Sequence, residues 1–136
     1  MVIPPVILIL GPTASGKSAL AFSLAELFDG QVEIVSADSM QIYRGMDIGT
    51  AKPSHAEQAR VPHHLIDVAN PHEEGFTVER WLESAHAAIE NIQCSGKSAV
   101  VVGGTNLYVQ ALLAGLFEGP SADESLRSTL RELSLA

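Results

Sequence analysis

Eight consecutive residues near the start of the chain have the types and spacing of a phosphate-binding loop. The stretch Gly11-Pro12-Thr13-Ala14-Ser15-Gly16-Lys17-Ser18 fits the P-loop pattern G-x-x-x-x-G-K-S/T. Glycine at both ends lets the backbone turn tightly, so that several N–H groups point at one anion, and the positive end of the following helix adds to the attraction. The sequence therefore predicts that a polyphosphate binds these residues.

Two side chains of this loop have a specific chemistry. Lys17 would bring a mobile positive charge to the outer phosphate oxygens. The Ser18 hydroxyl is placed to ligate a Mg²⁺ ion, which keeps most of its waters in such sites. An ordinary glycine-rich turn is the alternative, but the apolar run Val6–Leu10 before the loop and the helical pattern after it favour phosphate binding.

A second polar stretch follows the apolar segment 32–35. Asp38 begins it, and Ser39-Met40-Gln41 come next. Because ligands of open parallel sheets bind beyond the carboxyl ends of the strands, we expect Asp38 on the same rim as the P-loop. Its carboxylate could accept a proton or a hydrogen bond from an incoming nucleophile, or it could bind Mg²⁺ directly or through water. A solvated aspartate that caps a turn is the duller alternative.

Other polar residues give weaker signals. Gly103-Gly104-Thr105 at the start of a predicted helix suits either the close approach of a ligand or a simple helix cap. Arg44 and Lys52 bracket a glycine-rich loop and could meet phosphate. His63 and His64 are adjacent, and no third ligand stands at a recognisable spacing, so we favour a structural role over metal binding.

Apolar segments alternate with helical patterns along the chain. Apolar segments predict buried strands at 6–10, which we expect to be central, at 32–35 and at 99–102. A further short strand is predicted at 64–68. Helical spacing and caps predict four helices: 17–28, one that Thr77 caps and that runs through Ile92, 106 to about 113, and 121–136 with a cap at Ser121. The remainder of residues 42–71 is predicted to be irregular and to bind something.

This alternation predicts an α/β fold, a P-loop NTPase-like parallel sheet flanked by helices, with a strand arrangement like that of nucleotide kinases. The composition, 136 residues with 46% hydrophobic and 18% charged, is that of one globular domain. A net charge of −8 argues against a broad electrostatic grip on nucleic acid. The lone cysteine suits a reducing cytoplasm, and we expect neither an export signal nor a membrane anchor.

With these motifs in place, the chain resembles the family of tRNA dimethylallyltransferases, also called tRNA isopentenyltransferases or IPP transferases. Four stretches carry the resemblance in the order in which the family has them. They are the P-loop at 11–18, DSMQIYRGMDIGTAKP at 38–53, PHHLID at 62–67 and GGTNLY at 103–108. The resemblance covers almost the whole chain, and the second stretch is its most specific part.

The resemblance implies transfer of a dimethylallyl group from dimethylallyl diphosphate to N6 of the adenosine 3′ of the anticodon in tRNA. It implies that the P-loop holds the diphosphate and Mg²⁺, with Thr13 near the breaking bond and Asp38 as the general base. Ser39, Met40 and Gln41 match residues that contact the flipped-out base and its neighbours. Thr105 and Arg127 match positions that touch the tRNA anticodon stem-loop.

Members of that family are considerably longer than this chain. The resemblance therefore implies a truncated fold, with residues 1–120 as the N-terminal part of the catalytic domain and 121–136 as the start of a helical insertion or tRNA-binding region. We expect a cytoplasmic monomer. Three alternatives stay open: a P-loop kinase that phosphorylates small molecules with ATP, an adenylate isopentenyltransferase, and an inactive diphosphate-binding fragment.

Overall fold

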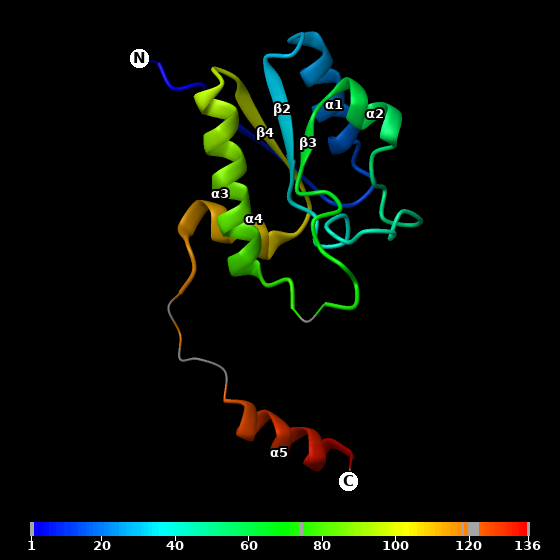
Figure 1. The fold of residues 1–136 in the computed structure, drawn as a ribbon, viewed down its shortest axis with the longest axis vertical. Helices are drawn as coiled ribbons and strands as arrows, with labels where there is room; N and C mark the ends of the chain where they lie inside the picture. Colours follow the sequence, from blue (N-terminus) through cyan, green and yellow to red (C-terminus); the bar gives the residue numbers. More distant parts are fainter. Residues whose placement is uncertain (1, 74, 118, 120–122, 136) are drawn as a thin grey trace.

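A parallel sheet forms the centre of the computed structural model, which describes residues 2–73, 75–117, 119 and 123–135 (Figure 1). Within these residues four strands pair in the order β1-β4-β2-β3. Their bounds are β1 (Val6–Leu10), β2 (Val32–Ser36), β3 (His63–His64) and β4 (Ser98–Gly103). Leu10 of β1 is level with Gly103 of β4, and Ser36 of β2 is level with Val102. Three carboxyl ends therefore meet at one edge.

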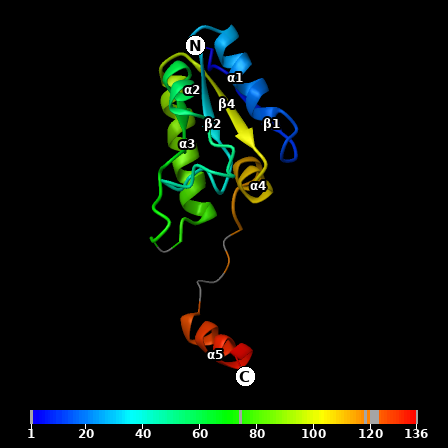
Figure 2. The ribbon, with the colours of Figure 1, turned by 90° about the vertical axis from the view of Figure 1, so that its right-hand side faces the viewer.

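Helices cover both faces of this sheet. Those described are α1 (Lys17–Leu27), α2 (His55–Arg60), α3 (Val78–Cys94), α4 (Asn106–Ala114) and α5 (Glu124–Leu135). α1 lies on one side of the sheet and α3 on the other (Figure 2). The α/β fold, a parallel sheet flanked by helices, is confirmed. None of the helices in the described ranges is long and apolar enough to cross a membrane.

Each face of the sheet has its own apolar core, because alternate residues of a buried strand point to opposite faces. Ile34 and Val100 pack with Ala21 of α1. On the other face, Val35 and Val101 pack with Trp81 of α3. The continuous apolar run of β4 and the apolar positions of β2 are explained by this double burial.

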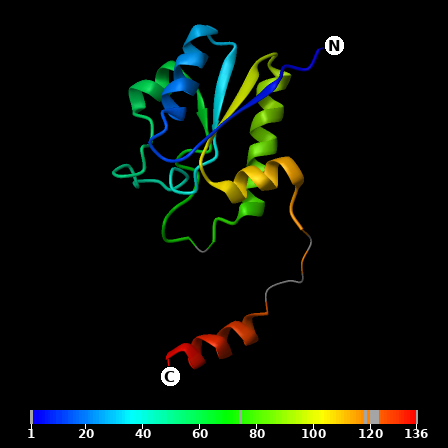
Figure 3. The same ribbon diagram turned by 180° about the vertical axis from the view of Figure 1, so that it is seen from behind.

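The predicted central position of residues 6–10 is wrong for the described part of the chain. β1 pairs there with β4 alone and forms the edge of the sheet (Figure 3). Ile7 and Leu10 are consequently 36% and 47% exposed. An apolar run predicts a strand, but strand order depends on contacts between distant segments, which the run does not encode.

Two elements between β2 and α3 differ from the predictions. The strand at 64–68 is shorter, because Leu65 and Asp67 have φ of +63° and +55°, which is incompatible with extended backbone. The short helix α2 was missed, although Ser54 and Glu57 form a capping box at its start.

The last helix begins after residue 123, where the Asp123 carboxylate accepts hydrogen bonds from the N–H groups of Ser125 and Leu126. The predicted cap at Ser121 lies outside the described residues. So does the predicted domain boundary at 120–121, which stays a prediction.

Candidate phosphate-binding site

A cavity of about 390 Å³ opens where the carboxyl ends of β1, β2 and β4 meet. Two stretches that are distant in sequence face each other across it, the P-loop and the segment after β2. The predicted site residues that line it are Thr13, Ala14, Gly16, Lys17, Ser18, Asp38, Met40 and Gln41. Gly11, Pro12, Ser15, Ser39, Thr105 and Arg127 are not among its lining residues.

The P-loop closes on itself and leaves donors free at its centre. Gly16, with φ of +82°, is the N-cap of α1 and offers no side-chain acceptor. The first N–H groups of the helix, which have no acceptor within a helix, therefore receive none from the cap. Lys17 reaches back across the loop and donates from Nζ to the Pro12 carbonyl oxygen at 3.0 Å. A Cβ on Gly11 would lie 2.9 Å from Ser15 Oγ, so a larger residue there would require the Ser15 side chain to rotate. Backbone donors and one ammonium therefore surround a space suited to an anion.

The Asp38 carboxylate has one fixed oxygen and one available oxygen. Oδ1 accepts hydrogen bonds from the N–H groups of Met40 at 2.8 Å and Gln41 at 3.3 Å. Among the described residues, none donates a hydrogen bond to Oδ2. The side chain is thus held in one orientation while an oxygen remains for a ligand.

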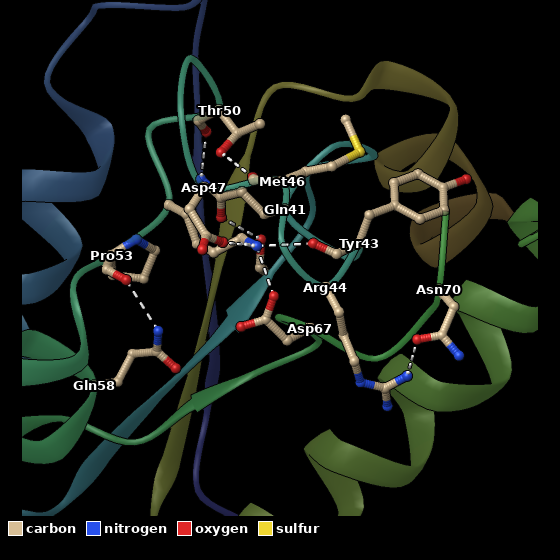
Figure 4. A network of polar contacts seen from close by, with 12 residues as sticks. Gln41, Tyr43, Arg44, Met46, Asp47, Thr50, Pro53, Gln58, Asp67 and Asn70 are labelled. Atoms are coloured by element: carbon tan, nitrogen blue, oxygen red, sulfur yellow. Dashed lines mark hydrogen bonds and ion pairs between the residues drawn. The ribbon is translucent and has the colours of Figure 1, made fainter. Parts of the chain in front are cut away.

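Gln41 is 8% exposed, and both ends of its amide group are hydrogen-bonded; Figure 4 shows Gln41 beside Thr50. Its Oε1 accepts from the Ser36 hydroxyl at 2.9 Å. Its Nε2 donates to the carbonyl oxygens of Thr50 at 3.2 Å and Ala51 at 3.1 Å. Since both amide hydrogens bind backbone, Gln41 holds the loop beside the cavity, and a nucleobase could reach only the second lone pair of Oε1.

Gly103 and Gly104 bring β4 close to the rest of the site. A Cβ on Gly103 would lie 2.2 Å from the Ala37 carbonyl oxygen, and one on Gly104 would lie 3.2 Å from that of Gly11. Thr105 then accepts a hydrogen bond from the Ser39 N–H at 3.0 Å. Its hydroxyl therefore fixes the segment that carries Asp38.

Three basic residues lie away from the cavity. Arg127 is on α5, apart from the sheet in Figure 1, and pairs with Glu124. Arg44 donates to the Asn70 side chain at 3.0 Å. The Lys52 ammonium binds two carboxylates and a carbonyl oxygen, and Lys52 lines the adjoining cavity described next, so its contact with phosphate stays a prediction.

A second cavity of about 360 Å³ adjoins the first along α1 and was not anticipated from the sequence. Both cavities share Ser18 and Gln41. His63 lines the second one, stacks on Phe22, and bonds through Nδ1 to the Val61 carbonyl oxygen at 2.7 Å. Burial lowers the pKa of His63 below its usual 6.5, which favours the neutral ring. The predicted structural role of His63 left this position unrecognised, because only the tertiary fold brings residue 63 to α1.

The oxygen ligands of the larger cavity could hold a hard divalent cation. Nowhere in the described ranges do three or more His, Cys, Asp or Glu side chains gather into a site in which protein ligands alone would hold a metal. Mg²⁺ in phosphate sites takes only one or two protein ligands and fills its shell with water and phosphate oxygens. The Ser18 hydroxyl and the Asp38 carboxylate, which line the same cavity, fit that requirement.

A P-loop at the end of parallel strand β1, with a carboxylate at the end of β2 on the other side of β4, defines an α/β protein of the P-loop class. The family model of IPP transferase matches residues 41–136. This chain belongs to the IPP transferase family.

Relatives and solved structures agree with that family. The chain is 59% identical over 128 residues to tRNA dimethylallyltransferase 2 of Geotalea uraniireducens, covering 94% of this chain and 40% of the relative. It is 57% identical to the tRNA dimethylallyltransferase of Methylococcus capsulatus, covering 92% and 39%. The structure of a tRNA isopentenylpyrophosphate transferase from Staphylococcus epidermidis superposes with a TM-score of 0.76 at 40% identity, covering 97% and 42%.

A eukaryotic dimethylallyltransferase acting on tRNA also superposes with a TM-score of 0.76, at 34% identity, covering 90% of this chain and 31% of that protein. The chain spans about 40% of the length of the curated relatives it matches.

Proposed function

We propose that this chain carries the diphosphate-binding part of an enzyme that transfers a dimethylallyl group from dimethylallyl diphosphate to N6 of the adenosine 3′ of the anticodon in tRNA. The observation that carries the proposal is the shared cavity of the P-loop and Asp38. Family membership, and relatives named tRNA dimethylallyltransferase, favour this reaction over phosphoryl transfer from ATP.

In the proposed reaction the P-loop holds a leaving group. The bond between the first carbon of the donor and the bridging diphosphate oxygen breaks, and the oxygen keeps the electron pair. Negative charge grows on the diphosphate, so the N–H groups of the loop and the Lys17 ammonium bind the transition state more strongly than the ground state. A Mg²⁺ ion held by Ser18, when bound, would neutralise further charge on the departing diphosphate.

Asp38 takes the proton in this proposal. The N6 lone pair of the adenine forms the new C–N bond, and the proton that N6 loses passes to the free Oδ2. Two backbone N–H groups hold Oδ1, so the carboxylate presents Oδ2 without having to reorient. A general base placed in this way contributes about 10²- to 10⁴-fold in rate.

The tRNA contacts belong to the same proposal. Met40 is 46% exposed and lines the cavity, which suits contact with an extruded base. Ser39 is bonded to Thr105, and Gln41 is bonded to Thr50, so their contribution is to shape the surface that the base meets. Arg127 is exposed on α5 and would contact phosphate of the anticodon stem-loop.

The experiment measures donor binding and transfer separately. Calorimetry follows dimethylallyl diphosphate with Mg²⁺ binding to the chain, and mass spectrometry of nucleosides follows prenylation of an unmodified tRNA. We expect Lys17→Ala to weaken donor binding by at least about tenfold. Asp38→Asn should leave binding within about twofold while lowering transfer by about 10²-fold or more.

Three parallel incubations decide between the alternatives. Dimethylallyl diphosphate with tRNA tests the proposed reaction, and the same donor with AMP in place of tRNA tests for an adenylate isopentenyltransferase. ATP with small alcohols tests for a kinase. ATP-dependent phosphorylation without prenylated adenosine would overturn the proposal, as would transfer to AMP in preference to tRNA. Donor binding without transfer to either acceptor would leave the chain a diphosphate-binding module.

A further inference from the structure

Lys52 is a nearly buried lysine whose ammonium group has every donor engaged. Its side chain is 4% exposed. Nζ donates to the Tyr43 carbonyl oxygen at 2.8 Å, to Asp47 Oδ1 at 2.7 Å and to Asp67 Oδ1 at 2.6 Å (Figure 4). An ammonium has three hydrogens, so no donor is left for a phosphate. We call these four residues the Lys52 cluster.

The Lys52 cluster joins the end of the loop 43–52 to two segments that are already bridged to each other, since Tyr43 pairs with Ala69. Tyr43 and Asp47 belong to the irregular loop after β2, and Asp67 follows β3 with a left-handed φ of +55°. Asp67 is held on its other side by its N–H, which donates to the Gln41 carbonyl oxygen at 3.1 Å. Backbone hydrogen bonds thus hold the beginning of the loop 43–52 beside the exit of β3, and the buried charge of Lys52 fastens the end of the loop there.

The electrostatics favour a charged lysine at this position. Burial alone would lower the pKa of Lys52, but hydrogen bonds and charge from Asp47 and Asp67 outweigh it and raise the pKa above its usual 10.5. Asp47 is largely exposed, with 63% of its side chain accessible, whereas 33% of Asp67 is accessible. Screening by solvent therefore makes Asp67 the stronger partner.

The loop that the cluster closes forms part of the phosphate cavity. Gly49, Thr50 and Ala51 line that cavity together with Lys17 and Ser18. Ala51 has φ of +51°, a conformation that alanine adopts only when neighbouring contacts impose it. The contacts on either side of it are the Gln41 amide and the Lys52 ammonium.

We propose that Lys52 is a positioning residue, which holds the loop 43–52 closed so that Gly49, Thr50 and Ala51 complete the diphosphate cavity. In this proposal Lys52 acts on diphosphate through the loop, because its ammonium donates to three protein oxygens. It strengthens diphosphate binding by keeping the binding-competent loop populated, and the inference rests on the proposed diphosphate-binding function.

The test compares two lysines that are both paired with carboxylates. Lys52→Met removes the cluster's charge. Lys97→Met is the matched control, because Lys97 pairs with Glu33 at 2.8 Å beside the opposite end of β4. Calorimetry measures binding of inorganic diphosphate with Mg²⁺, and hydrogen exchange measures protection of the amides of residues 44–51. We expect Lys52→Met to bind diphosphate about tenfold more weakly, because a loop that is closed in about one tenth of the molecules lowers the apparent affinity by that factor. Those amides should exchange faster, while the amides of β4 stay protected.

Further variants separate positioning from other effects. Asp67→Asn keeps Lys52 paired with Asp47, so we expect diphosphate to bind about threefold more weakly and the loop amides to lose part of their protection. This variant also tests the inference if Lys52→Met does not fold. Lys52→Arg retains charge and donors and should stay within about threefold of the original chain. Lys17→Ala should weaken binding without changing exchange in the loop.

The outcomes distinguish this inference from the proposed function. If the original chain does not bind diphosphate, the proposed function fails, while hydrogen exchange still reports whether Lys52 orders the loop. If the original chain binds and Lys52→Met binds equally well, or binds weakly with the loop still protected, Lys52 is not a positioning residue. An equal loss in Lys97→Met would also overturn the inference.

Discussion

Gly103→Ala should be strongly destabilising, because backbone atoms already occupy the place of the added methyl group. The new Cβ would lie 2.2 Å from the Ala37 carbonyl oxygen and 2.5 Å from its carbonyl carbon. Carbon and oxygen atoms in close van der Waals contact lie about 3.3 Å apart. The end of β4 would therefore have to move about 1 Å away from Ala37. The geometry of the P-loop and of Asp38 depends on the present position of β4.

The cost follows from the bonds that this movement would break. The Ala37 N–H donates to the Val102 carbonyl oxygen at 2.8 Å, and the Thr105 N–H donates to the Ala37 carbonyl oxygen at 3.3 Å. Losing both costs about 1 to 3 kcal/mol in free energy of unfolding. Overpacking adds about 1 to 3 kcal/mol. The total of about 2 to 6 kcal/mol is a large part of the 5 to 15 kcal/mol that roughly describes a whole domain.

Urea unfolding followed by circular dichroism measures this loss, and Gly104→Ala is the matched comparison. A Cβ on Gly104 would lie 3.2 Å from the Gly11 carbonyl oxygen and 3.7 Å from the flexible end of Lys17, so we expect a loss below about 1 kcal/mol. An unchanged urea midpoint for Gly103→Ala would refute the reasoning, as would equal losses in the two variants.

Three further predictions concern a cap, a titration and a hydroxyl. Thr77→Ala should lower the free energy of unfolding by about 1 kcal/mol in thermal melts, because the Thr77 hydroxyl accepts from the Arg80 N–H at 3.2 Å, and Thr77→Ser should not. Burial lowers the pKa of His63 below 6.5, so the unfolded chain binds a proton that the folded chain resists, and stability should fall as the pH drops below 6.5. His63→Gln should flatten that dependence when urea midpoints at about pH 7.5 and 5.5 are compared. Thr105→Val should cost about 1 to 2 kcal/mol in urea unfolding by leaving the Ser39 N–H without its acceptor, and a Thr105→Ser protein as unstable as Thr105→Val would contradict this explanation.

The parts of the fold that were predicted correctly are those encoded by neighbouring residues. The helix over 78–94 follows from its apolar period and the Thr77 cap, and the buried strands follow from short apolar runs. The capping box of Ser54 and Glu57 was also readable, but α2 has no buried residue, so no apolar period marked it. The edge position of β1 depends on which strand pairs with it, which periodicity does not determine.

The candidate site divides in the same way. The P-loop is contiguous and has a fixed pattern, whereas the work of Gln41 and Lys52 depends on partners nine to fifteen residues away across an irregular loop. The sequence predicts ligand contacts for both residues, because a polar side chain beside a motif gives no sign of whether protein or ligand will satisfy its hydrogen bonds. Their internal hydrogen bonds became visible only with the fold.

The buried position of Trp81 makes it an intrinsic fluorescence probe of the phosphate cavity. Trp81 is the single tryptophan of the sequence, and its indole N–H donates to the Ser36 carbonyl oxygen at 3.1 Å. The Ser36 hydroxyl in turn bonds to Gln41, which lines the phosphate cavity. Indole emission responds to the polarity and hydrogen bonding of its surroundings, so a ligand that shifts Gln41 would alter the fluorescence of Trp81. Rapid mixing could then time the filling of the cavity without any attached dye.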